Sequence, residues 1–132
     1  MIYFEKIILF LCLFLGVSFA DTGSTYRYKI GKHWQEFISF ERPDLLISAG
    51  CKKADAEFNC LSYSALTKAK VMKSWPAGGA NPGALICKNL QGSIVRGKNE
   101  RREENSFCKF SDKSMVSSAA LYVFALKNAK HE

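Results

Sequence analysis

Histidine is scarce in this chain, and its scarcity removes most catalytic arrangements that depend on an imidazole. The sequence holds two histidines, His33 and His131. His131 is the residue before the last, and His33 lies beside Trp34, where we expect a surface or half-buried side chain. A serine or cysteine nucleophile needs a positioned base, and one usable histidine offers few options. An enzyme is therefore the least supported class of function.

Closely spaced cysteine pairs are also missing. No Cys-x-x-Cys motif occurs, which argues against thiol redox chemistry. Structural zinc sites usually carry cysteines two to four residues apart in each half, and the spacings here are longer. We expect no metal and no cofactor, and a zinc site with four cysteine ligands is the alternative.

Long apolar runs are confined to the amino-terminal end. Residues 7–17 are apolar and uncharged, and Ser18-Phe19-Ala20 supplies small residues at the positions that a signal peptidase reads. We expect residues 1–20 to be a secretory signal peptide cleaved after Ala20, and an uncleaved anchor is the alternative. The run is short for a membrane span, and none of spanning length follows. We therefore expect a periplasmic or secreted protein without a membrane span in its mature form.

Charge and length set further bounds. Removing 20 of the 132 residues leaves 112, which fits one small domain. The formal net charge is +7, and we expect weak attraction to anionic surfaces. The basic residues are scattered and lack interleaved aromatics, so we expect no specific binding of nucleic acid.

Four cysteines follow the leader, and an exported chain carries them into an oxidising compartment. They allow three pairings. We favour Cys51 with Cys60 and Cys87 with Cys108, because each pair lies within one segment of the chain.

The amino-terminal half, residues 21–77, predicts an α/β segment whose fold stays unassigned. Residues 26–30 alternate like a short strand, and residues 34–40 fit either a helical turn or a bent strand. Pro43 breaks this segment because it disfavours helix at the preceding residue. Apolar residues at near-helical spacing predict a helix over residues 54–72.

The other half, residues 78–132, follows a linker rich in proline and glycine. Asn81 as N-cap and Pro82 at the first position begin a short helix that Gly92 ends. Two strands around a charged loop, Gly97 to Asn105, form a hairpin, a brief strand follows, and Ser117 or Ser118 caps a last helix. We therefore predict a small disulfide-stapled α+β domain of helix, hairpin and C-terminal helix.

One stretch of this half resembles a known family. The pieces are Asn81-Pro82-Gly83-Ala84, Cys87, Gln91-Gly92 and Phe107-Cys108-Lys109-Phe110-Ser111-Asp112. Over residues 78–122 they resemble the small bacterial exported family of domains of unknown function numbered 333, whose members are often labelled hemolysins. The resemblance implies a helix joined to a hairpin by a Cys87–Cys108 disulfide, and it implies no activity.

This chain departs from the family pattern in the turn and after it. Lys113 stands where the family usually has glycine. Gln91-Gly92, one of the matching pieces, corresponds to a Gly-Gly in the family pattern. Residues 117–120 replace an acidic stretch that ends in tryptophan. No long amphipathic or apolar inserting segment is visible, so the hemolysin label carries little weight.

The candidate binding residues are arginines of the charged loop and exposed aromatics: Arg101, Arg102, Trp34 and Trp75. A wider aromatic set could stack on sugars or on a partner, with ordinary core packing as the favoured alternative, and it adds Tyr26, Tyr28 and Tyr63. A carboxylate pair of the glycosidase type could come from Glu36, Glu41 and Asp44, which are more often solvated surface.

Two functions compete. The first is a non-catalytic binding module of the periplasm or cell surface that contacts an envelope component or an exported protein. The second is an inhibitor-like module whose loop 97–105 enters a protease or lysozyme cleft.

Overall fold

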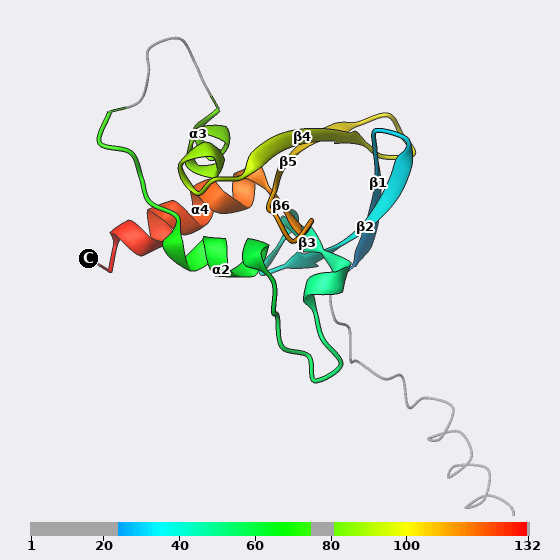
Figure 1. The fold of residues 1–132 in the computed structure, drawn as a ribbon, viewed down its shortest axis with the longest axis horizontal. Coiled ribbons are helices and arrows are strands. Elements are labelled where there is room, and N and C mark those ends of the chain that lie inside the picture. Colours follow the sequence, from blue (N-terminus) through cyan, green and yellow to red (C-terminus); the bar gives the residue numbers. More distant parts are fainter. Residues whose placement is uncertain (1–23, 75–80, 132) are drawn as a thin grey trace, which may run out of the picture.

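Six antiparallel strands close into a small barrel, and three short helices pack on one side of it (Figure 1). The computed structural model describes residues 24–74 and 81–131. Around the barrel the strands run in the order β1-β2-β3-β6-β5-β4. The elements are β1 Thr25–Ile30, β2 His33–Phe40, β3 Arg42–Ser48, the 3-10 turn η1 Ala49–Cys51, α2 Leu61–Lys68, α3 Pro82–Asn89, β4 Ser93–Lys98, β5 Glu104–Lys109, β6 Met115–Ser117 and α4 Ser118–Ala129.

The barrel contradicts the predicted α+β fold of helix, hairpin and C-terminal helix. The β4–β5 hairpin is present, but β5 also pairs with β6, and β4 closes against β1 from the other half of the chain. Likewise, β3 pairs with β6 through Ile47 and Val116. The alternation of apolar and polar residues indicates each strand, but it does not say which distant strand lies beside it.

The first half, whose fold the sequence left unassigned, is mostly β. The segment left open between a helical turn and a bent strand is β2, with a bulge at Ser39 and Phe40. The strand is interrupted at Glu41, whose φ is +59°, and β3 then begins at Arg42 and includes Pro43. Proline is tolerated in β3 because it lies at the start of the strand.

The predicted helix over residues 54–72 is also wrong in extent. Residues 52–59 form a protruding loop in which Asn59 N–H donates to the Cys51 carbonyl and Lys52 forms a β-bridge with Phe58. Within residues 54–72 the helix is confined to α2, Leu61–Lys68. It begins after residue 60 because the Cys51–Cys60 disulfide holds the preceding loop in place.

The helix α3 begins as predicted. The Asn81 side chain accepts from Gly83 N–H, and Pro82 occupies the first turn. Its end differs, because the left-handed residue is Gln91, with a φ of +65°, and not Gly92. Gly92 N–H instead donates to the Cys87 carbonyl, which completes a Schellman cap.

Two cores fill the molecule. The barrel interior holds Phe37 and Phe107, whose rings stack with centroids 4.2 Å apart, and Tyr28 meets both rings edge-on. The second core lies between the barrel and the helices, and its buried members include Leu45, Ile47, Leu66, Ile86, Val116 and Leu121. Neighbouring residues of β5 serve different cores, since Phe107 faces inward and Cys108 faces the helices.

Both predicted disulfides are present. The α-carbons lie 5.2 Å apart for Cys51–Cys60 and 5.7 Å apart for Cys87–Cys108, within the usual range. The first joins η1 to the start of α2, and the second joins α3 to β5. The expected signal peptide, residues 1–20, lies outside the described residues.

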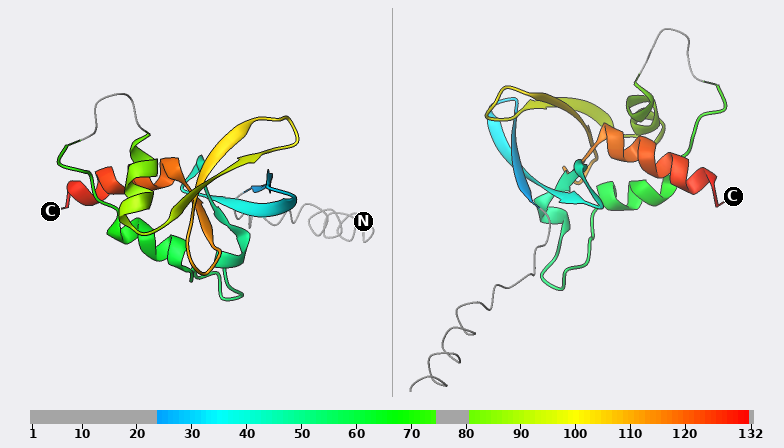
Figure 2. Two further views of the ribbon diagram at one scale, coloured as in Figure 1. Left: turned by 45° about the horizontal axis from the view of Figure 1, so that its top comes forward. Right: turned by 180° about the vertical axis from the view of Figure 1, so that it is seen from behind.

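The helices and the hairpin ends lie on opposite sides of the molecule. Figure 2 shows from two further directions that α2, α3 and α4 gather on one side, while the β1–β2 and β4–β5 turns project on the other. This leaves the hairpin ends and the strands next to them uncovered by helices.

Candidate functional site

The end of the β4–β5 hairpin is an ordered turn of five residues, Asn99 to Glu103. The Asn99 side-chain carbonyl accepts from Arg101 N–H at 3.0 Å and from Glu103 N–H at 2.9 Å. Arg102 N–H donates to the Asn99 carbonyl, and Arg102 has a φ of +64°. One asparagine side chain therefore fixes the shape of the turn. The turn is shorter than the predicted loop of residues 97–105, because both strands extend into that range.

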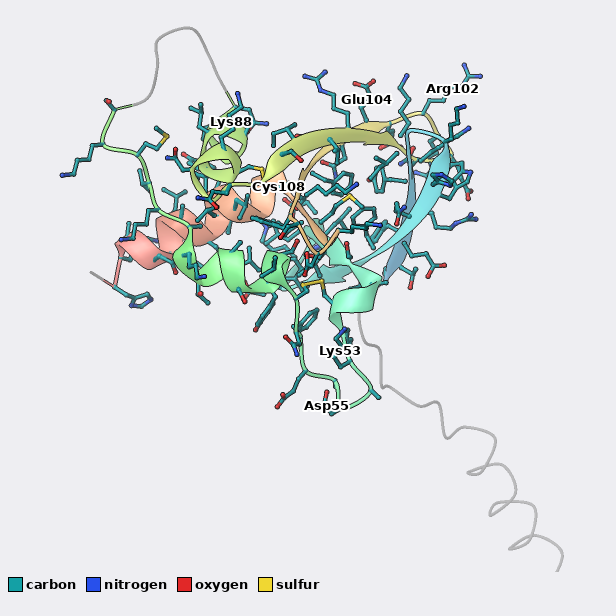
Figure 3. All side chains as sticks on the ribbon, in the orientation of Figure 1. Lys53, Asp55, Lys88, Arg102, Glu104 and Cys108 are labelled. Atoms are coloured by element: carbon teal, nitrogen blue, oxygen red, sulfur yellow. A yellow bond between two sulfur atoms is a disulfide. The ribbon has the colours of Figure 1, made fainter. Side chains whose placement is uncertain are left out.

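Both predicted arginines of this turn are exposed to solvent. The Arg101 side chain is 86% exposed, and its guanidinium lies 4.0 Å from the Glu103 carboxylate. Figure 3 labels Arg102 at the far end of the hairpin, pointing away from the barrel. Both side chains are therefore accessible to a partner, and the contact of Arg101 with Glu103 is long and exposed.

The turn is tied to Trp34 through Arg27. The Arg27 guanidinium lies over the Trp34 ring, 5.1 Å from its centroid, and 3.6 Å from the Glu100 carboxylate. Trp34 is 42% exposed. We call the surface made by Arg27, Trp34, Glu100, Arg101 and Arg102 the tip face. Each of its links is exposed and weak, so the face can rearrange at little cost.

The structure thus brings together three of the four predicted binding residues, Trp34, Arg101 and Arg102. Trp75, the fourth, lies outside the described residues. Arg27 was not among the predictions. The alternation of residues 26–29 signals that Arg27 points outward, but only the barrel shows that it meets the distant hairpin.

Strand β1 leaves part of its edge unpaired beside the tip face. Among the described residues, Lys29 and Lys98 are the one register pair between β1 and β4. The Ser39 N–H donates to the Ser24 carbonyl, which makes these two residues a hydrogen-bonded pair. Such pairs alternate with non-hydrogen-bonded pairs along an antiparallel ladder. The backbone N–H and C=O of Arg27, opposite Glu36, therefore point away from β2. They face a hollow of about 480 Å³ between β1 and the turn, lined by Thr25, Tyr26, Arg27, Tyr28, Asn99, Glu100, Arg101 and Glu103.

The wider aromatic set is not gathered into one surface. Tyr28 is buried in the barrel, and Tyr26 packs partly against the same core. Tyr63 is exposed on α2, where it stacks on Phe58 of the 52–59 loop. Figure 3 shows that this loop, marked by Lys53 and Asp55, projects from a different part of the molecule than Arg102.

The carboxylates considered for a glycosidase pair make local contacts. Glu41 pairs with Lys127 of α4. Asp44 accepts two hydrogen bonds from the Arg42 guanidinium, at 3.1 and 2.7 Å. Glu36 lines a separate hollow of about 570 Å³ beside the Cys51–Cys60 disulfide.

Asp112, at the rim of that second hollow, caps α2. Its carboxylate accepts from Leu61 N–H at 2.8 Å and from the Ser114 hydroxyl at 2.6 Å. The Ser114 hydroxyl oxygen in turn accepts from Ser62 N–H at 3.0 Å. Partial desolvation raises the pKa of Asp112, but the hydrogen bonds from Leu61 and Ser114 outweigh it and lower the pKa below 3.8. Asp112 and Ser114 therefore already have hydrogen-bond partners within the fold, and neither is an unsatisfied polar side chain at this hollow.

Comparisons with known proteins give no relative. No family model matches the chain, and no curated protein or solved structure matches it either. The resemblance to family 333 therefore stays a prediction.

In residues 24–74 and 81–131, no group of three or more histidine, cysteine, aspartate or glutamate side chains is placed to hold a metal ion. No helix in that part of the chain has the length and apolar character to cross a bilayer.

Proposed function

We propose that this protein is a non-catalytic, exported binding module that contacts an envelope component or another exported protein through the tip face. The observation that carries the proposal is the juxtaposition of exposed Trp34 with Arg27 and the ordered turn. Tryptophan and arginine are among the residues most enriched at binding hot spots. The unpaired edge of β1 beside them can add hydrogen bonds to an extended partner segment.

The two disulfides support an exported location, because such bonds persist in oxidising compartments. The cleavage after Ala20 belongs to the same proposal. Sequencing the amino terminus of the exported protein tests it, and a mature chain beginning at a residue other than Asp21 would contradict it.

The test of the tip face compares two double variants with the same change in net charge, together with Trp34→Ala. Immobilised mature protein is offered an envelope extract, and the captured component is then titrated against purified variants. We expect Arg101→Ala/Arg102→Ala and Trp34→Ala each to weaken binding about tenfold or more. Lys68→Ala/Lys70→Ala, which removes two exposed lysines at and after the end of α2, should bind like the wild type. Equal loss in both double variants would show a general charge effect and contradict the proposal.

The second candidate is a hydrolase inhibitor that inserts the same turn into a protease or lysozyme cleft. The hydrogen bonds that Asn99 accepts favour it, because a pre-ordered loop binds without a large entropy cost. Under this candidate Asn99→Ala should weaken inhibition as strongly as Arg101→Ala. Loss of envelope binding with no inhibition of a hydrolase panel by the wild type would exclude it.

We also propose that residues 78–122 share the fold of family 333. The two positions where this chain lacks the family's glycines, Gln91 and Lys113, both have positive φ values, +65° and +69°. Glycine adopts that conformation without strain, so the family's residues would suit this backbone. Position 83 counts against a shared fold, because the alanine of the Asn-Pro-Ala pattern would bring a β-carbon into overlap with the Ser118 carbonyl of this backbone.

A further inference from the structure

Another pocket lies farther along the seam between β1 and β4, on the outer surface of the barrel. Its volume is about 390 Å³, and it is lined by Lys29, Gly31, Arg96, Gly97, Lys98 and Glu104. We call it the seam pocket. None of its lining residues belongs to the tip face, although Lys29 lies opposite Trp34 in the β1–β2 register, so the two surfaces adjoin.

The strand register explains why cations converge there. Lys29 and Lys98 lie directly opposite each other across the seam. Tyr28 and Ile30, which flank Lys29 in β1, pack in the barrel interior, so Lys29 points outward. The buried residue Gly97 likewise separates Lys98 and Arg96, which share the outer face of β4.

The charges in the pocket are not balanced. Lys98 lies 3.6 Å from the Glu104 carboxylate. Lys29 and Arg96 are exposed, and neither has an ion pair or a side-chain hydrogen bond within the described residues. Lys29 and Lys98 carry like charges on opposite sides of the seam, an arrangement that destabilises strand pairing. An anion bound between Lys29 and Lys98 would remove this repulsion.

Access to the pocket is open at its rim. Gly31 occupies the β1–β2 turn with a φ of +62°, and nothing lies within 4 Å of the place where its β-carbon would be. Any larger residue would occupy this space and strain the turn. A small tetrahedral anion can therefore approach the two unpaired cations from solvent.

We propose that the seam pocket binds a phosphate group. The Arg96 guanidinium presents two parallel N–H donors that suit phosphate oxygens, and the ammonium groups of Lys29 and Lys98 act as point charges. The ligand is a phosphate carried by a lipid headgroup or by a free phosphorylated polymer. The inference does not depend on the proposed function of the tip face.

The first experiment titrates the mature protein with inorganic pyrophosphate at constant ionic strength, followed by amide chemical shifts. We expect saturable shifts at residues of the seam pocket. Lys29→Gln/Arg96→Gln should weaken binding about tenfold or more, and Lys68→Gln/Lys70→Gln, with the same change in net charge, should not. Non-saturable shifts, or equal weakening in both double variants, would overturn the proposal.

The second experiment separates the two sources of phosphate. Sedimentation with vesicles of phosphatidylcholine and phosphatidic acid tests a headgroup, and titration with polyphosphate tests a free polymer. Binding to either that is lost in Lys29→Gln/Arg96→Gln supports the site and names the source, and binding to neither contradicts it. Tighter binding to duplex DNA than to polyphosphate, unaffected by the seam variant, would also overturn it. Arg101→Ala/Arg102→Ala should keep phosphate binding, which separates this result from failure of the tip face.

Discussion

At the scale of single residues, Gly92 is where the fold leaves no room for a side chain. A β-carbon at this position would overlap the Cys108 sulfur and press against the Cys87 sulfur. We expect Gly92→Ala to destabilise the protein by about 2–4 kcal/mol, through strain or through loss of the disulfide. Urea denaturation measures the first effect, and titration of free thiols measures the second.

The control for this variant is Gly50→Ala. Gly50 lies in η1 near the other disulfide, and nothing lies within 4 Å of its missing β-carbon. This variant should unfold within about 0.5 kcal/mol of the wild type. If Gly92→Ala is equally harmless and keeps both disulfides, the close packing of α3 against β5 is not as described.

Lys113 shows the opposite situation, a side chain where the backbone favours none. Its φ is +69°, in a turn where Phe110 N–H donates to the Ser114 carbonyl. A left-handed residue other than glycine costs about 1–2 kcal/mol, and glycine loses part of that gain to its flexible unfolded state. We expect Lys113→Gly to stabilise the protein by about 0.5–1 kcal/mol in urea denaturation. Lys113→Ala keeps the β-carbon and should give no gain, so equal stabilisation by both variants would contradict the argument from backbone strain.

At the scale of elements, α2 depends on groups from a distant turn for the start of its first turn. Asp112 and Ser114 accept from Leu61 N–H and Ser62 N–H, and the Cys60 sulfur accepts from Tyr63 N–H. We expect Asp112→Ala to destabilise the protein by about 1 kcal/mol near neutral pH. Asp112→Asn keeps an acceptor oxygen without the charge, so it should retain most of that stability.

The pH dependence of this effect follows from the direction of the shift. The folded state lowers the pKa of Asp112 below 3.8, so the carboxylate contributes its full stability above that value. The contribution is lost as the pH falls below 3.8 and through the folded-state pKa. In urea denaturation, the advantage of the wild type over Asp112→Ala should therefore shrink in acid. An advantage that grows toward low pH would contradict the assigned direction.

Elements with strong local signals could be predicted from the sequence, and those held by distant contacts could not. Asn81 and Pro82 mark the start of α3, and the strand at residues 26–30 follows from simple alternation. The predicted helix over residues 54–72 is too long, because its apolar spacing carries no information about the 52–59 loop. The cap from Asp112 is 51 residues away from Leu61, so no local pattern could reveal it.

At the scale of the whole molecule, the candidate sites exist only because two halves of the chain meet. Arg101 and Trp34 could be chosen from the sequence as an exposed-loop arginine and an aromatic. Their connection through Arg27 and Glu100 required the closure of β1 against β4. The same closure places Lys29 beside Lys98, which the sequence separates by 69 positions and which no local periodicity relates.

This closure also bears on how the chain is divided. The sequence suggests a boundary near residue 77, whereas the ring of Phe107 from β5 lies fully buried against Phe37 and Tyr28. Removing the core partners of a large buried aromatic ring costs several kcal/mol of folding stability. We therefore expect residues 78–132, expressed alone with the Cys87–Cys108 bond intact, to lack a cooperative thermal transition.

Circular dichroism during heating measures this transition, and the mature chain with both disulfides serves as the control. The mature chain should unfold in one cooperative step, as small domains generally do. Adding the segment of residues 21–77 to the isolated fragment should restore part of the transition, because β3 and β1 then pair again with β6 and β4. A sharp transition in the isolated fragment would instead show that the helix and hairpin form a unit of their own. In that case the tip face and the seam pocket, which take residues from both halves, would lie at the junction of two separately folding parts.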